Sequence, residues 1–218
     1  MDWTHWKNWY QKIILDFGYD PERDLESAKI LNNYIKKTKN FHNFDILKPL
    51  IQNKIVFIYG CGPSLPIHLN LLGSLPLPLE DFTHIAADGA TSALLENNII
   101  PQVILTDLDG QISDLITANK KGSIVIIHAH GDNIDLIRQN FSLFSGNVLG
   151  TTQNEPLSLV KNFGGFTDGD RCVFLAEALK SSSIVLIEFD FGNVIEKYSK
   201  PYLKKDELAS KNKVKKLQ

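Results

Sequence analysis

The hydrophobic pattern of the chain changes near residue 54. Before that point, apolar residues recur at spacings of three and four, which places them on one face of a helix. These residues are Trp3, Trp6, Tyr10, Ile13, Ile14 and Phe17. A second helix is expected from Asp20, which can cap it, to Lys37, with Pro21 at its first position. We therefore predict a small helical N-terminal segment over residues 1–50.

The aromatic stripe of the first helix has two possible roles. It could bind a ring-shaped ligand, but aromatic residues at helical spacing more often form a core or a subunit interface. Left exposed, a stripe of this size would promote aggregation. We expect the N-terminal helices to pack onto the rest of the chain or across a homo-oligomer.

After residue 54, apolar runs of strand length alternate with helical stretches. The expected strands are 55–59, 84–87, 103–106, 123–128, 148–151 and 184–189, and the expected helices are 65–72, 91–97, 113–120, 134–144 and 168–181. The run 124–127 lacks polar alternation, which is typical of strands covered on both faces. The pattern predicts an α/β fold over residues 51–195, with a mainly parallel six-stranded sheet and crossover helices.

Polar, glycine-containing clusters follow the apolar runs. They lie at 60–64, 87–90, 106–110, 128–133, 150–153 and 166–171. The carboxyl ends of parallel strands meet at one edge of a sheet, where helix N-termini present their amides to a ligand. We therefore expect the clusters to form one site and the chain to be an enzyme. Carboxylates without an arginine cluster favour a metal-bound polyphosphate as ligand.

The strongest local motif is Thr106-Asp107-Leu108-Asp109-Gly110. Two carboxylates placed near one point repel each other unless a cation holds them. We expect Asp107 and Asp109 to bind Mg²⁺, which would bridge them to substrate phosphates. The alternative is an Asx turn with a helix cap.

A glycine turn at residues 60–64 begins like a dinucleotide-binding motif, but Leu65 stands in place of the third glycine. Its backbone amides can still approach a phosphate, and Ser64 can cap the next helix. The alternative is a tight turn needed only for packing. The residues expected to contact the nucleotide are Gly60, Gly62, Ser64, Gly89, Thr106 and Arg171.

Two histidines alternate at one predicted strand end, in His128-Ala129-His130-Gly131-Asp132. No third zinc ligand is visible. We assign His128 to the core, His130 to polar contact or proton transfer, and Asp132 to the metal or the nucleophile. Asp88, at another strand end, could orient a substrate hydroxyl or amine. Asp88, His130 and Asp132 are therefore the catalytic candidates, with structural roles as the alternative.

The remaining clusters suit a flat, polar ring. Aromatic rings beside a glycine pair can stack on a heterocycle or form only a hydrophobic lid. Short polar side chains at a strand end can supply neutral hydrogen bonds, and a threonine can cap the last helix. The expected substrate-binding residues are Thr151, Thr152, Gln153, Phe163, Phe166, Thr167 and Asp168.

The charge of the chain is unevenly distributed. Residues 197–218 carry eight lysines against Asp206 and Glu207, although the net charge of the whole chain is −2. An acidic body attracts polyphosphate only with a divalent cation as mediator. The Lys-rich tail, residues 196–218, carries no nucleic-acid-binding motif, so we expect it to be solvated and no nucleic acid to be a partner.

Composition limits the remaining possibilities. Cys61 and Cys172 lie far apart and form no zinc motif, so both are expected to be small buried side chains. No apolar run approaches the ~20 residues that span a bilayer, and the N-terminus does not read as a signal peptide. We expect a cytoplasmic protein without a membrane partner.

Taken in order, these motifs resemble those of the archaeal 6-hydroxymethyl-7,8-dihydropterin diphosphokinases, whose sheet is similar to that of thiamin pyrophosphokinases. The likeness covers nearly the whole chain, and it includes Met1-Asp2-Trp3, Asp16-Phe17-Gly18-Tyr19, Glu22-Arg23-Asp24, the strand-end clusters and residues 162–171. Gly110 departs from the thiamin enzymes, which usually carry serine there. This difference argues against thiamin as the substrate.

The resemblance implies transfer of diphosphate from ATP to the hydroxymethyl group of a reduced pterin, releasing AMP, on the way to methanopterin-type or folate-type carriers. It implies that Asp107 and Asp109 hold Mg²⁺, with Asp132 near the metal or the hydroxyl. The pterin would lie among Asp88, Thr151, Gln153 and residues 163–168. The alternatives are a metal-dependent glycosyltransferase that uses a nucleotide sugar, and a non-catalytic nucleotide-binding domain.

Overall fold

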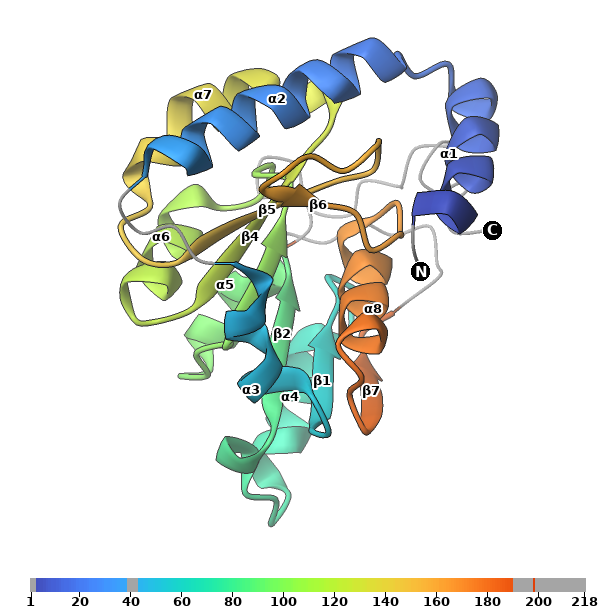
Figure 1. The fold of residues 1–218 in the computed structure, drawn as a ribbon. Coiled ribbons are helices and arrows are strands. Elements are labelled where there is room, and N and C mark those ends of the chain that lie inside the picture. The colour runs from blue at the N-terminus through green and yellow to red at the C-terminus, as the bar shows by residue number, and fades with distance from the viewer. Residues whose placement is uncertain (1–2, 39–42, 190–197, 199–218) are drawn as a thin grey trace.

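The computed structural model describes residues 3–38, 43–189 and 198. Its centre is a parallel seven-stranded sheet in the order β6-β5-β4-β3-β2-β1-β7 (Figure 1). The strands are β1 (Ile55–Tyr59), β2 (Thr83–Ala87), β3 (Val103–Thr106), β4 (Ile124–Ala129), β5 (Val148–Thr152), β6 (Val160–Lys161) and β7 (Ser183–Ile187). The predicted α/β class is confirmed, but the predicted count of six strands is wrong by one. β6 was missed because two residues are too short to show a pattern.

Eight α-helices surround the sheet in the described part of the chain. They are α1 (Trp3–Phe17), α2 (Pro21–Lys37), α3 (Lys48–Ile51), α4 (Leu65–Ser74), α5 (Ala90–Glu96), α6 (Ile112–Lys120), α7 (Ile134–Asn140) and α8 (Asp168–Ala178). Short 3₁₀ turns lie at Phe44–Leu47, Leu79–Asp81, Gly131–Asn133 and Phe141–Leu143. The predicted helix at 134–144 is therefore an α-helix followed by a tighter turn.

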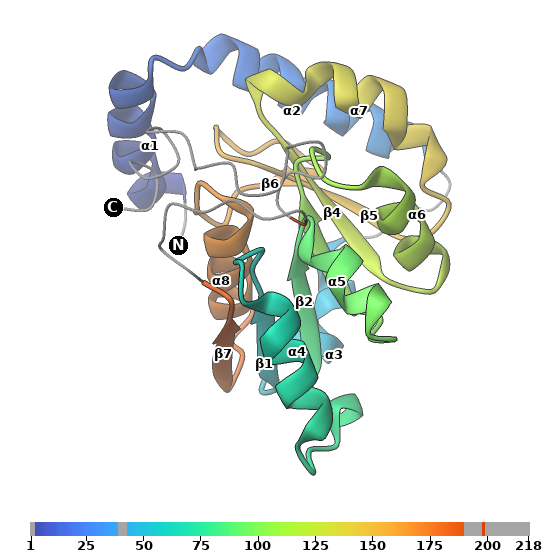
Figure 2. The same cartoon turned by 180° about the vertical axis from the view of Figure 1, so that it is seen from behind.

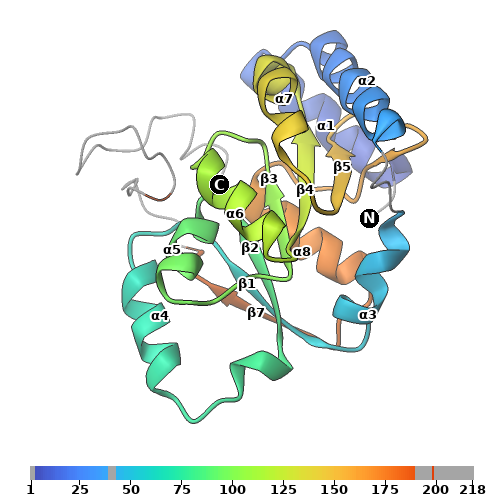
Figure 3. The same ribbon diagram turned by 90° about the vertical axis from the view of Figure 1, so that its left-hand side faces the viewer.

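The sheet is the middle of three layers. One face packs against α2, α4, α5, α6 and α7, which Figure 2 shows from the side of α4 and α5. The other face packs against α3 and α8. β6 lies at one edge of the sheet. From there the chain crosses the second face as α8 and then adds β7 beside β1, at the other edge. Figure 3 shows α8 and α3 on the opposite side of the sheet from α4 and α5.

The last strand ends earlier than predicted. The apolar run at 184–189 suggested a strand to Phe189, but β7 ends at Ile187. Glu188 has a φ of 62°, in the left-handed region, which breaks the extended backbone. β7 is an edge strand, and Val185 and Leu186 are 37% and 49% exposed.

The N-terminal helices share the core of the sheet. Asp20 caps α2 as predicted, since its carboxylate accepts the amide of Glu22 at 2.9 Å. Leu31 and Ile35 of α2 are buried over β5. Gly150 in β5 permits this approach, because an added Cβ would lie 2.7 Å from Ile35 Cδ1. In α1, Trp6 is buried, which confirms that the stripe packs against this same chain.

Three further expectations have simple outcomes. No helix in the described residues is both long and apolar enough to cross a membrane. Cys172 is fully buried as expected, whereas Cys61 is only half-buried, and both are free thiols. The Lys-rich tail lies outside the described residues except for Tyr198, which is buried.

Candidate active site

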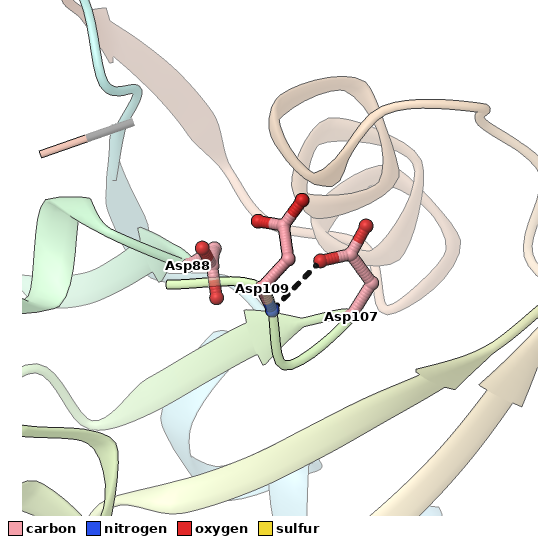
Figure 4. Close-up of side chains that lie close together, drawn as sticks. All are labelled: Asp88, Asp107 and Asp109. Atoms are coloured by element: carbon pink, nitrogen blue, oxygen red, sulfur yellow. Dashed lines mark hydrogen bonds between the residues drawn. The ribbon is translucent and has the colours of Figure 1, made fainter. Parts of the chain in front are cut away.

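Three aspartates meet at the carboxyl ends of β2 and β3 (Figure 4). Asp88 follows β2, and Asp107 and Asp109 follow β3. Each offers one carboxylate oxygen, and these oxygens lie within 4.8 Å of one another. Asp88 is only 5% exposed. Negative charges this close repel each other, and a cation between them would offset the repulsion.

Local backbone geometry brings the three carboxylates together. Asp88 and Leu108 have φ values of 40° and 70°, so each strand turns sharply at its end. The Thr106 hydroxyl donates to Asp88 and accepts the amide of Leu108 at 2.8 Å. The Asp109 amide donates to Asp107 Oδ1 at 3.3 Å (Figure 4), so the Asx turn considered as an alternative is present. This turn is what directs both carboxylates of the motif to one point.

The donor set fits a hard divalent cation. Asp88, Asp107 and Asp109, here called the acidic cluster, all offer carboxylate oxygens. These are the ligands that Mg²⁺ prefers. Gly110 leaves room for this arrangement, since an added Cβ would lie 2.4 Å from Asp88 Oδ2. From the sequence, Asp88 was expected to orient a substrate hydroxyl or amine, and the structure places it with the two predicted metal ligands. Mg²⁺ itself stays a prediction.

Gly110→Ala is expected to lower kcat about 10- to 100-fold, because the new methyl group displaces Asp88 and a misplacement of about 1 Å in a catalytic group costs roughly this factor. Steady-state kinetics with a thermal melt would measure it. Gly73→Ala is the matched control, since an added Cβ there meets nothing within 4 Å. Equal rates in the two variants would contradict the assignment of Asp88 to the cluster.

His130 orients Asp107. Its Nδ1 accepts the Asp132 amide at 3.3 Å, so in the neutral ring the proton sits on Nε2. Nε2 then donates to Asp107 Oδ2 at 3.3 Å. Both ring nitrogens are engaged, so His130 is better placed to position the carboxylate than to take a proton. Asp132 is exposed at the same strand end.

Asn133 joins the two strand ends, a role that the sequence interpretation missed. Its amide group donates to the Asp107 carbonyl at 2.9 Å and to the His128 carbonyl at 2.6 Å. Its oxygen accepts the His130 amide at 3.1 Å and the Ser27 hydroxyl at 3.2 Å. The side chain is buried and locks β3, β4 and α2 together. The only signal was its place in the strand-end cluster.

Arg171 and Asp168 form a buried ion pair against the acidic cluster. Arg171 Nη1 donates to Asp168 Oδ1 at 2.9 Å. Burial, and then the charge of Asp107, raise the pKa of Asp168 well above its usual range, and Arg171 opposes this. Arg171 Nη2 donates to Gln153 Oε1 at 3.2 Å and to the Phe166 carbonyl. The structure thus shows Arg171 holding the loop before α8, whereas the sequence assigned it to the nucleotide.

A cavity of about 230 Å³ opens beside the acidic cluster. Part of its wall comes from the N-terminal segment, and part from the strand ends and the loop before α8. The lining residues are Gly18, Tyr19, Asp20, Arg23, Asp24, Asp107, His130, Gly131, Asp132, Gln153, Phe166 and Arg171. Sequence reasoning missed the part that residues 18–24 take in this site.

Several predicted substrate-binding residues do not line this cavity. Phe163 packs on Phe44 with ring centroids 5.1 Å apart. The Thr151 hydroxyl contacts His128 Nδ1 at 3.1 Å, and Thr152 Oγ1 accepts the Asn154 amide at 3.2 Å. Thr167 forms the predicted cap of α8 together with Asp170.

His128 is a core histidine, as predicted. The residue lies within β4 and is only 2% exposed. Burial, and next the charge of Arg171, lower the pKa of His128 well below its usual value. The ring is therefore neutral at physiological pH and serves packing.

The glycine turn after β1 is tightly packed. An added Cβ at Gly60 would lie 2.4 Å from the Glu188 carbonyl oxygen, and one at Gly89 would overlap the Tyr198 carbonyl. Ser64 stands at the predicted N-cap position of α4, but its hydroxyl donates to the Glu188 carboxylate at 2.6 Å and makes no side-chain cap bond to the helix. Packing thus accounts for the glycines at 60 and 89, and contact of this turn with a nucleotide stays a prediction.

The fold and the site define the class of protein: a parallel α/β protein with a cluster of three aspartates at the carboxyl edge of its sheet. Residues 29–196 match the protein family described as 6-hydroxymethylpterin diphosphokinase MptE-like. The match covers most of the chain and includes every residue of the acidic cluster.

Three archaeal relatives carry the name 6-hydroxymethyl-7,8-dihydropterin pyrophosphokinase. The protein of Methanocaldococcus jannaschii is 46% identical over 100% of this chain and 92% of its own. That of Pyrococcus furiosus is 44% identical over 100% and 90%. That of Methanothermobacter thermautotrophicus is 45% identical over 90% and 82%. This chain belongs to the MptE-like family of 6-hydroxymethylpterin diphosphokinases, so the resemblance seen in its motifs and its nature as an enzyme are confirmed.

One solved structure shows a much weaker similarity. The MAf glycosyltransferase from Magnetospirillum magneticum aligns with 65% of this chain and 23% of its own, at 19% identity and a TM-score of 0.48. A likeness this distant does not carry an argument about function. The family match leaves the glycosyltransferase alternative unfavoured.

Proposed function

We propose that this enzyme transfers the diphosphoryl group of ATP to the hydroxymethyl oxygen of 6-hydroxymethyl-7,8-dihydropterin, giving AMP and the pterin diphosphate. The observation that carries the proposal is that the acidic cluster and a small cavity adjoin and share Asp107. The names of the full-length relatives support the chemistry of the acceptor.

The acidic cluster would hold Mg²⁺ through Asp88, Asp107 and Asp109. An ion bound there supplies charge neutralisation to the phosphate oxygens, the main need of phosphoryl transfer. The role of His130 is to hold Asp107 in position. Asn133 keeps the same turn in place through its bond to the Asp107 carbonyl.

In the reaction, the hydroxymethyl oxygen bonds to the β-phosphorus, and the bond from that phosphorus to the oxygen bridging it to the α-phosphorus breaks. AMP leaves with that bridging oxygen. Asp132, which lines the cavity and is exposed, would take the hydroxyl proton. Such assistance adds little when the transition state is loose, so positioning outweighs the base.

The broader setting belongs to the same proposal. The product would feed methanopterin-type or folate-type carriers in the cytoplasm. Assembly through the N-terminal helices stays a prediction, which sedimentation of the purified protein would test.

Incubation with ATP, Mg²⁺ and reduced hydroxymethylpterin is expected to yield AMP and pterin diphosphate in equal amounts, because attack is at the β-phosphorus. Chromatography of nucleotides and pterins measures both products. Omission of the pterin should abolish AMP release, and a nucleotide sugar in place of ATP should give no product. ADP as the sole nucleotide product would rule out diphosphate transfer.

A further inference from the structure

The cavity beside the acidic cluster has a volume of about 230 Å³, below the ~300–1,000 Å³ usual for pockets that take drug-sized ligands. It is therefore of a size for one small ring system rather than for a whole nucleoside triphosphate. One wall, between α1 and the first turn of α2, is formed by Gly18, Tyr19, Asp20, Arg23 and Asp24. The opposite wall is built by residues from the ends of β4 and β5 and from the loop before α8.

Asp24 is a buried carboxylate in this wall, with only 3% of the residue exposed. Its oxygens accept the Tyr10 hydroxyl at 2.8 Å, the Gln153 side-chain amide at 2.8 Å and the Gly131 amide at 2.6 Å. All three donors are uncharged. A carboxylate has about four acceptor positions, so these bonds leave one for a ligand.

Two aromatic rings line the cavity and pack on each other. Tyr19 comes from the N-terminal wall and Phe166 from the loop before α8, and their centroids are 5.8 Å apart. Phe17 stacks on both, with centroids 5.7 Å from Tyr19 and 6.1 Å from Phe166. Such ring faces and edges suit contact with a flat heterocycle.

A chain of hydrogen bonds leads from this wall to Asp168. Gln153 donates to Asp24 and accepts from Arg171, and Arg171 donates to Asp168. Asp24 and Asp107 line the same cavity, so a ring held at Asp24 lies beside the acidic cluster.

We propose that Asp24 is the specificity-determining residue for the acceptor, an inference that rests on the function proposed above. Its carboxylate accepts a hydrogen bond from the 2-amino group of the amino-oxo-pyrimidine ring. The bicycle lies against Tyr19 and Phe166, which points its hydroxymethyl arm toward Asp107. The N-terminal helices thus supply the recognition of the acceptor, and the sheet supplies the chemistry.

Asp24→Asn tests this, because it removes the charge and nearly preserves the volume. The KM for the pterin is expected to rise at least about 10-fold, since hydrogen bonds to charged groups are the strong ones. The KM for ATP should stay within twofold. Glu22→Gln is the matched control, an exposed carboxylate in the same turn that does not line the cavity, and its kinetics should equal those of wild type.

A second measurement changes the ligand instead of the protein. Pterin fluorescence titrations without ATP should show wild type binding an analogue that has hydrogen for the 2-amino group at least about 10-fold more weakly than the pterin. Asp24→Asn should discriminate the two poorly, and wild type alone suffices if the variant does not fold.

Equal binding of pterin and analogue by wild type would overturn the assignment of Asp24. A rise of both KM values in Asp24→Asn by the same factor would also overturn it, because it would show a purely structural role. Wild type that neither binds nor converts the pterin would instead contradict the proposed function.

Discussion

Asp107→Asn and Asp109→Asn are each expected to lower kcat at least about 100-fold while the fold stays intact. Each substitution removes a charged ligand from the acidic cluster and nearly preserves the side-chain volume. Asp88→Asn should fall in the same range, because its oxygen lies within 4.8 Å of theirs. Steady-state kinetics across a Mg²⁺ titration, with circular dichroism for folding, would measure the effect.

The double variant Asp107→Asn/Asp109→Asn should lose much less than the product of the two single effects, since both residues serve one site. Asp135→Asn is the control, a carboxylate with 82% side-chain exposure in α7, and should keep wild-type kcat. Near-normal rates with Mg²⁺ in either single variant would remove the metal-site assignment.

Trp6→Ala is expected to lower the free energy of unfolding by about 3–5 kcal/mol, the usual cost of truncating a buried tryptophan. Trp6 is 5% exposed, and its indole Nε1 donates to the Gln153 carbonyl at 2.8 Å. Because Gln153 also bonds Asp24, the KM for the acceptor should rise as well. Urea denaturation and kinetics below the melting temperature would measure the two effects.

Trp9→Ala is the matched control on the same helix. Trp9 is 56% exposed, and its loss should cost less than about 1 kcal/mol. Equal destabilisation by the two substitutions would show that α1 does not pack through Trp6. Both variants replace Trp by Ala in α1, so the change in helix propensity is the same. The difference between their free energies of unfolding therefore reports the burial of Trp6.

The sequence did not predict that residues 18–24 contribute to the site. Asp24 lies on the same face of α2 as Ala28, Leu31 and Ile35, all of which are buried. An acidic residue on an apolar helical stripe was the available signal, because a buried carboxylate needs partners. Those partners could not be identified from the sequence, since Gln153 is 129 residues away.

The sequence by itself determined the elements and the acidic motif. Buried parallel strands are continuous apolar runs, and turn residues bound them, so five of the predicted strands have close counterparts in β1–β5. Asp107 and Asp109 lie two residues apart in one turn, so the local sequence is enough to bring them close together. The Asp20 cap and Pro21 likewise act within a single helical turn.

Only the tertiary structure decided which distant residues complete the site. Asp88 joined the acidic cluster because β2 and β3 are neighbours in the sheet, and β6 formed only through pairing with β5. The cavity exists because α2 packs across β5 at Gly150 and carries Asp24 to the ends of β4 and β5. Strands and turns follow from short-range propensity, whereas these contacts depend on the packing of whole elements, which no local pattern encodes.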